Sequence, residues 1–227
     1  MIDNDLHISE KSSIRGLFST AYLPPQSYIA ALLKCEKIKL EKHEFYTKQT
    51  YRNRCKILTA NGIMDLILPV EKPNGNKTLT KDILISNHTN WQILHWRTIE
   101  SAYRNSPFFE YYKDDFLPFY TQKHKFLFDF NLNLMWKIIE LLQIDLPEIS
   151  FSEKYEIANR SQTDHQEVDF RNAINPKKEN ALEQTPYYQV FADKYNFVPN
   201  LSIIDLLFNL GNEAEGYLSN ITKREPH

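Results

Sequence analysis

The sequence has few glycines and no uninterrupted apolar run, and each shortage excludes a class of protein. Its 5 glycines among 227 residues form neither a GxGxxG nor a GxxxxGK pattern, so we expect no glycine-rich phosphate-binding loop. Its most apolar long stretch, 126–142, is interrupted by charged and amide side chains, which excludes a membrane-spanning helix and predicts no membrane insertion. The first residues carry acidic side chains and no apolar run, so no signal peptide is expected.

Familiar catalytic and metal-binding signatures are also missing. The 2 cysteines, Cys35 and Cys55, form no CxxC pair, and two thiols alone do not make a zinc site. No histidine pair has HxxxH spacing and no GxSxG motif is present, so the sequence supports neither a metal site nor a covalent mechanism without excluding them, and it leaves the cofactor unknown. Free thiols fit a reducing cytosol, and we expect a cytoplasmic protein. The cationic neighbours of Cys55 would lower the pKa of its thiol, but no nearby base supports a nucleophilic role.

The charges are balanced overall but concentrated locally. The formal net charge of −2 at pH 7 argues against a nucleic-acid-binding protein, which usually has a basic face. Residues 46–57, however, hold four cations and two tyrosines between two expected strands. An unpaired buried charge is costly, and a plain surface loop would be richer in Gly, Ser and Asp. This stretch therefore predicts a site for a small anionic ligand, with Lys48, Arg52 and Arg54 as donors; RNA binding through it is a weaker alternative.

The apolar patterns predict an α/β fold, with a mixed sheet in the N-terminal half and a largely helical C-terminal half. Strands are expected at 17–23, 37–41, 56–59, 63–70, 83–85 and 146–149. Helices are expected at 26–36, 90–107, 108–120, 126–142, 201–210 and 213–218. Asn61-Gly62 predicts a hairpin turn between the third and fourth strands. Residues 1–13 should form a flexible tail and 14–220 a single domain, within which the polar segment 159–186 should be a long loop.

An ordered set of motifs resembles the WbqC-like protein family. The motifs are Tyr22-Leu23-Pro24-Pro25, Lys48 with Asn53-Arg54 and Ile57, Leu68-Pro69-Val70, Trp91 with His95-Trp96-Arg97-Thr98-Ile99, and Tyr103 with Pro107-Phe108. Four further motifs look like the version of the family found in Bacteroidetes. They are Asp169-Phe170-Arg171, Pro176-Lys177-Lys178, Tyr188-Gln189-Val190-Phe191 and the run from Val198 to Asn209. The resemblance covers the chain from about Leu17 to Leu218, so the single domain is expected to be WbqC-like.

The resemblance implies an enzyme of surface polysaccharide biosynthesis, of the O-antigen type, that acts on a nucleotide-activated sugar. Acyl or aminoacyl transfer is one reaction class that it suggests. Many relatives have His-Gln-Pro at the end of the first strand, where this chain has Phe18-Ser19-Thr20. The imidazole that would be a candidate for catalysis in those relatives is therefore replaced by Phe18 here.

Three donors are the leading substrate-binding candidates. Lys48, Asn53 and Arg54 are expected to converge with the end of the first strand and to bind the diphosphate of a sugar nucleotide, because forked arginine donors suit phosphate. Tyr22 would border the same pocket. The alternative is a solvated loop in which Arg54 pairs with a carboxylate and Asn53 holds a turn.

The remaining site candidates lie later in the chain. His95 is the candidate catalytic base, since an imidazole titrates near neutral pH, but it is equally explained as a buried helix histidine bonded to the backbone. Arg97 and Arg171 are further substrate-binding candidates. Lys177 and Lys178 would close over a phosphate like a lid, or else belong to an exposed run of charges.

A second function class is a non-catalytic binding or assembly protein for enzymes of glycan synthesis. The replacement at Phe18 favours it, because loss of a catalytic histidine often leaves a binding site behind. An exposed aromatic patch would support it, since large apolar patches mark partner surfaces. The residues expected in that patch are Tyr103, Phe108, Phe109, Tyr111 and Tyr112. The sequence gives no indication of the oligomeric state.

Overall fold

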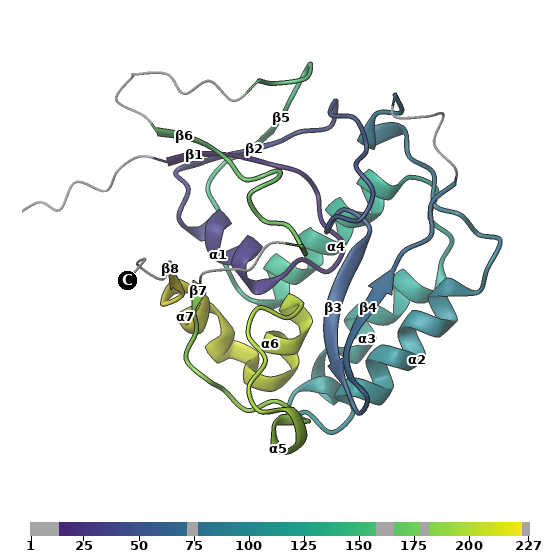
Figure 1. The fold of residues 1–227 in the computed structure, drawn as a ribbon, viewed down its shortest axis with the longest axis vertical. Coiled ribbons are helices and arrows are strands. Elements are labelled where there is room, and N and C mark those ends of the chain that lie inside the picture. The colour runs from purple at the N-terminus through teal and green to yellow at the C-terminus, as the bar shows by residue number, and fades with distance from the viewer. Residues whose placement is uncertain (1–13, 72–76, 158–165, 178–181, 224–227) are drawn as a thin grey trace, which may run out of the picture.

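A four-stranded parallel sheet forms the first layer of the molecule. The computed structural model describes residues 14–71, 77–157, 166–177 and 182–223 (Figure 1); the expected tail at 1–13 lies outside them. The sheet order is β5-β2-β1-β6, and every neighbouring pair is parallel. Its strands are β1 (Ile14–Phe18), β2 (Lys37–Leu40), β5 (Ile149–Phe151) and β6 (Gln166–Asp169). Because all four strands run the same way, their carboxyl ends meet at one edge of the sheet.

The chain passes from β1 to β2 through helix α1 (Gln26–Leu33), which makes a compact βαβ unit. The expected strand at 17–23 ends at Phe18, because the next residues bond elsewhere: the backbone N–H of Tyr22 donates to the carbonyl of Tyr51 at 2.8 Å. Leu23 has a φ of 41°, a left-handed conformation that costs a bulky residue about 1 kcal/mol or more. This turn directs Tyr22 into the core.

A hairpin forms a second, separate sheet. Its strands, β3 (Arg54–Thr59) and β4 (Gly62–Ile67), pair antiparallel, and Gly62 has the positive φ of 100° that the predicted turn requires. The strand expected at 63–70 therefore ends at Ile67. The strand expected at 83–85 is reduced to two isolated bridges, Val70 with Ile85 and Leu84 with Phe126.

Six further α-helices and two 3-10 turns lie in the described chain. They are α2 (Trp91–Tyr103), α3 (Phe109–Thr121), α4 (Leu127–Leu141), α5 (Ala192–Tyr195), α6 (Ile203–Leu210) and α7 (Ala214–Ser219), with 3-10 turns η1 (Thr80–Asp82) and η2 (Gly211–Glu213). Pro118 lies inside α3 rather than ending it. In Figure 1, α1, α6 and α7 lie below the parallel sheet. Helices α2 and α3 lie on the other side of the hairpin from α6. The parallel sheet, the hairpin and the long helices of the second half confirm the predicted α/β class.

The polar segment 159–186 contains strands that the sequence did not indicate. β6 lies there, and the two-residue strand β7 (Leu182–Glu183) pairs with β8 (Thr222–Lys223). β6 is an edge strand that pairs only with β1 in the described part of the chain, which explains its polar sequence. The expectation of a structureless loop is therefore wrong for 166–169.

Aromatic packing joins the helices to one another. The ring of Phe208 on α6 lies 5.3 Å from that of Tyr103, 5.2 Å from that of Phe109 and 5.5 Å from that of Phe116. Such edge-on and tilted pairs are favourable beyond their buried area. Among the helices of the described residues, none is both long and apolar enough to cross a bilayer.

Candidate functional site: two open clefts

A buried ion-pair network lies where the parallel strands end. Arg171, just after β6, donates to both carboxylate oxygens of Asp169 at 2.9 and 2.7 Å, and its Nη1 lies 3.4 Å from Glu41, just after β2. Glu41 also accepts the Ser152 hydroxyl, just after β5, at 2.5 Å. Burial alone would raise the pKa of Asp169, but the hydrogen bonds and charge of Arg171 outweigh it and lower that pKa. The network ties three strand ends together.

A second buried ion pair lies after β1. Arg52 donates to the two carboxylate oxygens of Glu44 at 2.7 and 2.6 Å and to the hydroxyl of Ser19 at 2.6 Å. Asn131 of α4 donates to the Arg52 carbonyl at 2.7 Å and fixes its backbone. The forked donor group of Arg52 is thus used within the protein, and its charge is already matched.

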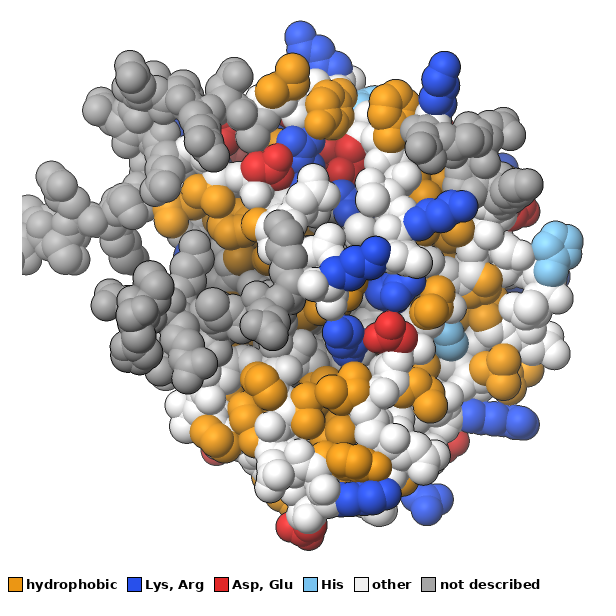
Figure 2. Space-filling model, viewed as in Figure 1, with side chains coloured by type: hydrophobic (Ala, Val, Ile, Leu, Met, Phe, Trp, Pro, Cys, Tyr) orange, Lys and Arg blue, Asp and Glu red, His pale blue; other side chains and the backbone are white. Residues whose placement is uncertain are grey.

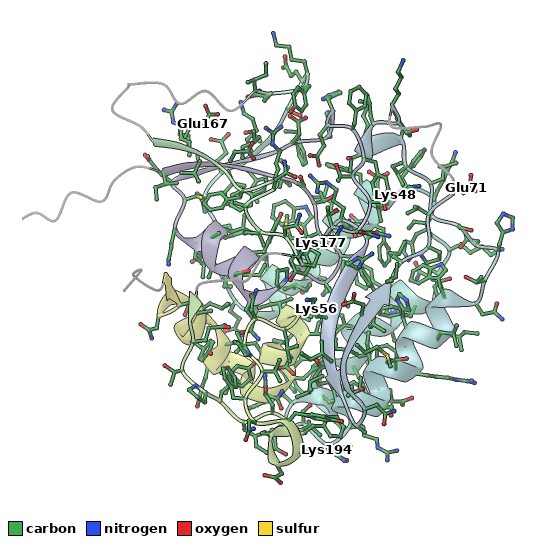
Figure 3. The ribbon with its side chains drawn as sticks, viewed as in Figure 1. Lys48, Lys56, Glu71, Glu167, Lys177 and Lys194 are labelled. Atoms are coloured by element: carbon green, nitrogen blue, oxygen red, sulfur yellow. The ribbon has the colours of Figure 1, made fainter. Side chains whose placement is uncertain are left out.

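An open cleft of about 440 Å³ lies between the hairpin and the segments before and after β7. Its lining residues are Tyr51, Lys56, Ile63, Pro176, Lys177, Gln184, Val198, Pro199, Asn200 and Leu201; we call it the lysine cleft. Lys56 donates to the carbonyl of Pro176 at 3.1 Å, and Lys177 is exposed. Figure 2 shows basic side chains gathered in the middle of the face that is turned toward the viewer. Figure 3, seen from the same side, shows Lys56 and Lys177 near each other on that face.

A second open cleft, of about 540 Å³, lies over the ion-pair network. Its lining residues are His43, Glu44, Phe45, Thr47, Leu79, Glu153, Lys154, Tyr155, Arg171 and Asn172; we call it the aromatic cleft. A cavity of about 10 Å³, bordered by Tyr51, Arg52 and Arg171, lies between the two clefts. That volume holds about one water, so packed side chains separate the clefts.

The three leading donors differ in exposure and in their partners. Lys48 is exposed, Asn53 is buried with its amide donating to the carbonyl of Leu68 at 3.0 Å, and Arg54 pairs with Asp65 at 3.3 Å. Asn53 lies just before β3 and Arg54 begins it, and both already bond to groups within the protein. A shared anion-binding hollow formed by Lys48, Asn53 and Arg54 stays a prediction.

Tyr22 and His95 contact each other inside the core rather than in a cleft. The Tyr22 hydroxyl lies 2.8 Å from His95 Nδ1 and 3.0 Å from the Tyr120 hydroxyl. Burial lowers the pKa of His95 to about 4, although a hydrogen bond with the backbone of Ile67 opposes this. Burial also raises the pKa of Tyr22. His95 is thus a neutral, buried helix histidine, and neither residue lines the lysine cleft or the aromatic cleft.

The later candidates have different surroundings. Arg97 is exposed on α2, Arg171 lies in the buried network beneath the aromatic cleft, and Lys177 lines the lysine cleft. Lys178 lies outside the described residues. Lys56 was not among the candidates; its place between buried Cys55 and Ile57 on an alternating strand was the signal that it faces outward.

Two residues that the sequence singled out, Cys55 and Phe18, are packed in the core, and burial of Cys55 fits a structural role. Cys55 is fully buried, and burial raises the pKa of its thiol, opposite to the effect expected from its cationic neighbours. Phe18 is packed in the core with its ring stacked on Phe170 at 4.6 Å, so no cleft opens onto it. Among the described residues, no group of three or more His, Cys, Asp or Glu side chains is arranged to hold a metal ion.

The expected aromatic patch on α2 and α3 is mostly internal. Tyr103, Phe109 and Tyr112 are buried, whereas Phe108 and Tyr111 are exposed. The three buried rings pack toward α6 and η2 and give no surface to a partner. The patch therefore does not exist in the form expected.

Comparison with known proteins identifies a family and a relative. A model of the WbqC-like protein family matches residues 20–183. Uncharacterized protein Rv1507c of Mycobacterium tuberculosis is 26% identical over 225 residues, which covers 89% of this chain and 96% of that protein. No solved structure matches.

Proposed function

The chain belongs to the WbqC-like protein family, and from that premise we propose that it binds a nucleotide-activated sugar through the lysine cleft. The observation that carries this proposal is the one-sided charge of the cleft. Lys56 and Lys177 line it, and none of the described residues that line it is acidic, although the chain as a whole has a net charge of −2. Lysine is a common partner of phosphate as a point charge.

The other lining groups fit a phosphate-bearing ligand. Asn200 is buried, and its Nδ2 has no hydrogen-bond partner among the described residues, while its Oδ1 accepts the backbone N–H of Ser27 at 2.9 Å. A buried amide without a partner costs free energy unless a ligand or water satisfies it. The volume of about 440 Å³ falls within the range of small-molecule pockets.

The proposal places the protein in the biosynthesis of surface polysaccharide. Acyl or aminoacyl transfer to the sugar rests on the family resemblance alone, because the described lining of the lysine cleft includes no histidine, carboxylate or cysteine. A cytoplasmic location belongs to the same proposal, since Cys35 and Cys55 are free thiols.

A non-catalytic binding protein is the second candidate. It rests on the family resemblance, by which Phe18 replaces the imidazole of many relatives; Phe18 is packed in the core, and no cleft lies beside it. The first candidate requires a nucleotide-sugar ligand, whereas an assembly protein for enzymes of glycan synthesis does not, so ligand binding is tested first.

Isothermal titration with UDP-N-acetylglucosamine and with UDP tests the proposal. Lys56→Ala and Lys177→Ala are each expected to weaken binding about tenfold, because each removes one cation from the phosphate site. Lys194→Ala is the matched control: Lys194 is exposed and donates to the carbonyl of Ala60 at 2.8 Å, much as Lys56 does to Pro176, but it lies outside the cleft (Figure 3). Equal affinity in all three variants, or no binding by the folded protein, would contradict the proposal.

A further inference from the structure

The aromatic cleft exposes two large rings that come from distant parts of the chain. Phe45 follows β2 and Tyr155 follows β5; their exposed fractions are 56% and 54%. At the top of the face in Figure 2, hydrophobic and acidic side chains lie close together. Rigid aromatic rings bordering a cleft offer apolar area to a ligand at a small cost in conformational entropy.

The charges of this cleft are balanced, in contrast to those of the lysine cleft. Its described lining includes two carboxylates, Glu44 and Glu153, and two cations, Lys154 and Arg171. Arg171 is matched by Asp169, and Glu44 is matched by Arg52. An anion entering the cleft would meet no unmatched buried cation, so the cleft favours a ligand without net charge.

The polar groups of the cleft are suited to hydroxyl groups. Carboxylate oxygens accept hydrogen bonds, and an imidazole both donates and accepts them, whereas each hydroxyl of a ligand can do either. His43 is held in place: its backbone N–H donates to Glu41 at 2.7 Å, and its Nδ1 lies 3.4 Å from the Ser152 hydroxyl. Its ring is only half-buried and borders the cleft.

The floor of the cleft is fixed before any ligand arrives. Arg171 and Glu44 are both buried, and the guanidinium of Arg171 lies 5.1 Å from the centre of the Tyr155 ring. The carbonyl of Glu156 accepts Arg171 Nη1 at 2.9 Å and so ties the Tyr155 segment to the network. A ligand therefore meets a preorganised surface and orders few side chains on binding.

We propose that the aromatic cleft is a second ligand site, which binds an uncharged molecule rich in hydroxyl groups, such as a monosaccharide unit. The C–H face of a sugar ring would pack on Phe45 or Tyr155, and its hydroxyls would bond to His43 and the cleft carboxylates. This site does not depend on the lysine cleft, because the two are separated by the packed residues around Arg52 and Arg171.

Saturation-transfer NMR with the full chain tests the site, with methyl glycosides of glucose, galactose and N-acetylglucosamine as probes. At least one glycoside is expected to bind at millimolar concentration, and Phe45→Ala and Tyr155→Ala are each expected to weaken it about tenfold or more. The matched control is Tyr188→Ala, because Tyr188 is 57% exposed but lies outside the cleft. Phe45 and Tyr155 are exposed, so their removal should leave the thermal unfolding midpoint nearly unchanged.

Three outcomes would overturn the proposal. They are the absence of transfer to any of the glycosides from folded protein, binding that survives in both cleft variants, and displacement of the glycoside by UDP. The last outcome would place the sugar in the lysine cleft. If Lys56→Ala loses UDP binding but binds the glycoside unchanged, the result would instead support two separate sites. If the protein binds the glycoside but not UDP, only the nucleotide proposal would be contradicted.

Discussion

The hydroxyl of Tyr22 lies 2.8 Å from Nδ1 of His95, although the two residues are 73 positions apart in the chain. The contact joins the turn after β1 to helix α2 and is enclosed by the rings of Trp91 and Phe130. Since the imidazole also bonds to the backbone of Ile67, it is held on two sides within the core. This arrangement explains why His95 stabilises the fold rather than bordering a cleft.

His95 should make stability depend on pH. Burial lowers the pKa of His95 to about 4, below the ordinary 6.5, so the folded state binds fewer protons between these values and loses stability as the pH falls through them. The loss amounts to about 3 kcal/mol. His95→Gln should be less stable than the wild type at pH 7 but should lose less on acidification. Urea unfolding at several pH values between 7 and 4.5 measures this.

The control for that prediction is His88→Gln, because His88 is exposed. It should leave the free energy of unfolding at pH 7 nearly unchanged. An identical acid slope in the wild type and in His95→Gln would show that His95 is not buried in the neutral form.

Asp205 should act in the opposite direction. Burial raises the pKa of Asp205 to about 6, although hydrogen bonds from Tyr187, Gln189 and Tyr103 oppose this. The folded state therefore binds more protons between the ordinary pKa of 3.8 and 6, and this contribution to stability is lost as the pH rises through that window. Asp205→Asn removes the loss and should make the protein gain more stability than the wild type between pH 4.5 and 7, by about 2–3 kcal/mol.

The test uses the same urea series, with the wild type and His95→Gln beside it. The two substitutions should change the acid slope with opposite signs relative to the wild type. If Asp205→Asn instead flattens the profile in the way that His95→Gln does, the carboxyl group is ionised in the fold at acid pH, and the prediction fails.

The α/β class, the hairpin and the long helices could be predicted because they depend on local patterns. Asn61-Gly62 specifies a tight turn, and the stripe on α2 has helical spacing. β6 could not be predicted, because an edge strand with the sequence QEVD gains its stability from pairing with β1, a long-range contact. Likewise, nothing in the local sequence indicates that Arg52 pairs with Glu44, so Arg52 could be taken for a ligand-binding donor of the basic stretch.

The site was only partly predictable for the same reason. Lys177 and the basic stretch pointed toward the lysine cleft, since a local excess of cations is visible in the sequence. The aromatic cleft could not be anticipated, because Phe45 and Tyr155 are brought together only when β2 and β5 pair. Strand order, rather than local sequence, decides which residues share a cleft.

Arg52 should contribute far more to stability than Arg54. Removing one partner of a buried, bidentate pair leaves Glu44 as an unmatched charge, so Arg52→Met should lower the free energy of unfolding by about 3–5 kcal/mol. Arg54→Met is the matched comparison: its pair with Asp65 is longer, at 3.3 Å, and partly exposed, so the loss should be about 1 kcal/mol or less. Equal losses, measured by urea unfolding at pH 7, would contradict the structural role given to Arg52.

Gly16 and Phe18 should be coupled, because they face the same side of β1. A Cβ atom on Gly16 would lie 2.4 Å from Cε2 of Phe18 and 2.6 Å from Sγ of Cys35, so Gly16→Ala should lower the free energy of unfolding by about 1–3 kcal/mol. Phe18→Leu alone leaves a partly filled cavity and should also destabilise the fold. In the double variant the smaller side chain makes room for the methyl group, so the combined loss should fall short of the sum by about 1 kcal/mol.

Gly216→Ala controls for the effect of the glycine itself, since a Cβ there meets nothing within 4 Å and α7 should gain up to about 1 kcal/mol from it. Strict additivity of the two β1 substitutions in urea unfolding would mean that the Phe18 ring can move away from Gly16. Phe18→His would then be accommodated at this position. If the coupling is found, Phe18 is fixed in the core by its neighbour on β1, and Phe18→His should destabilise the fold because it buries a polar ring without a partner.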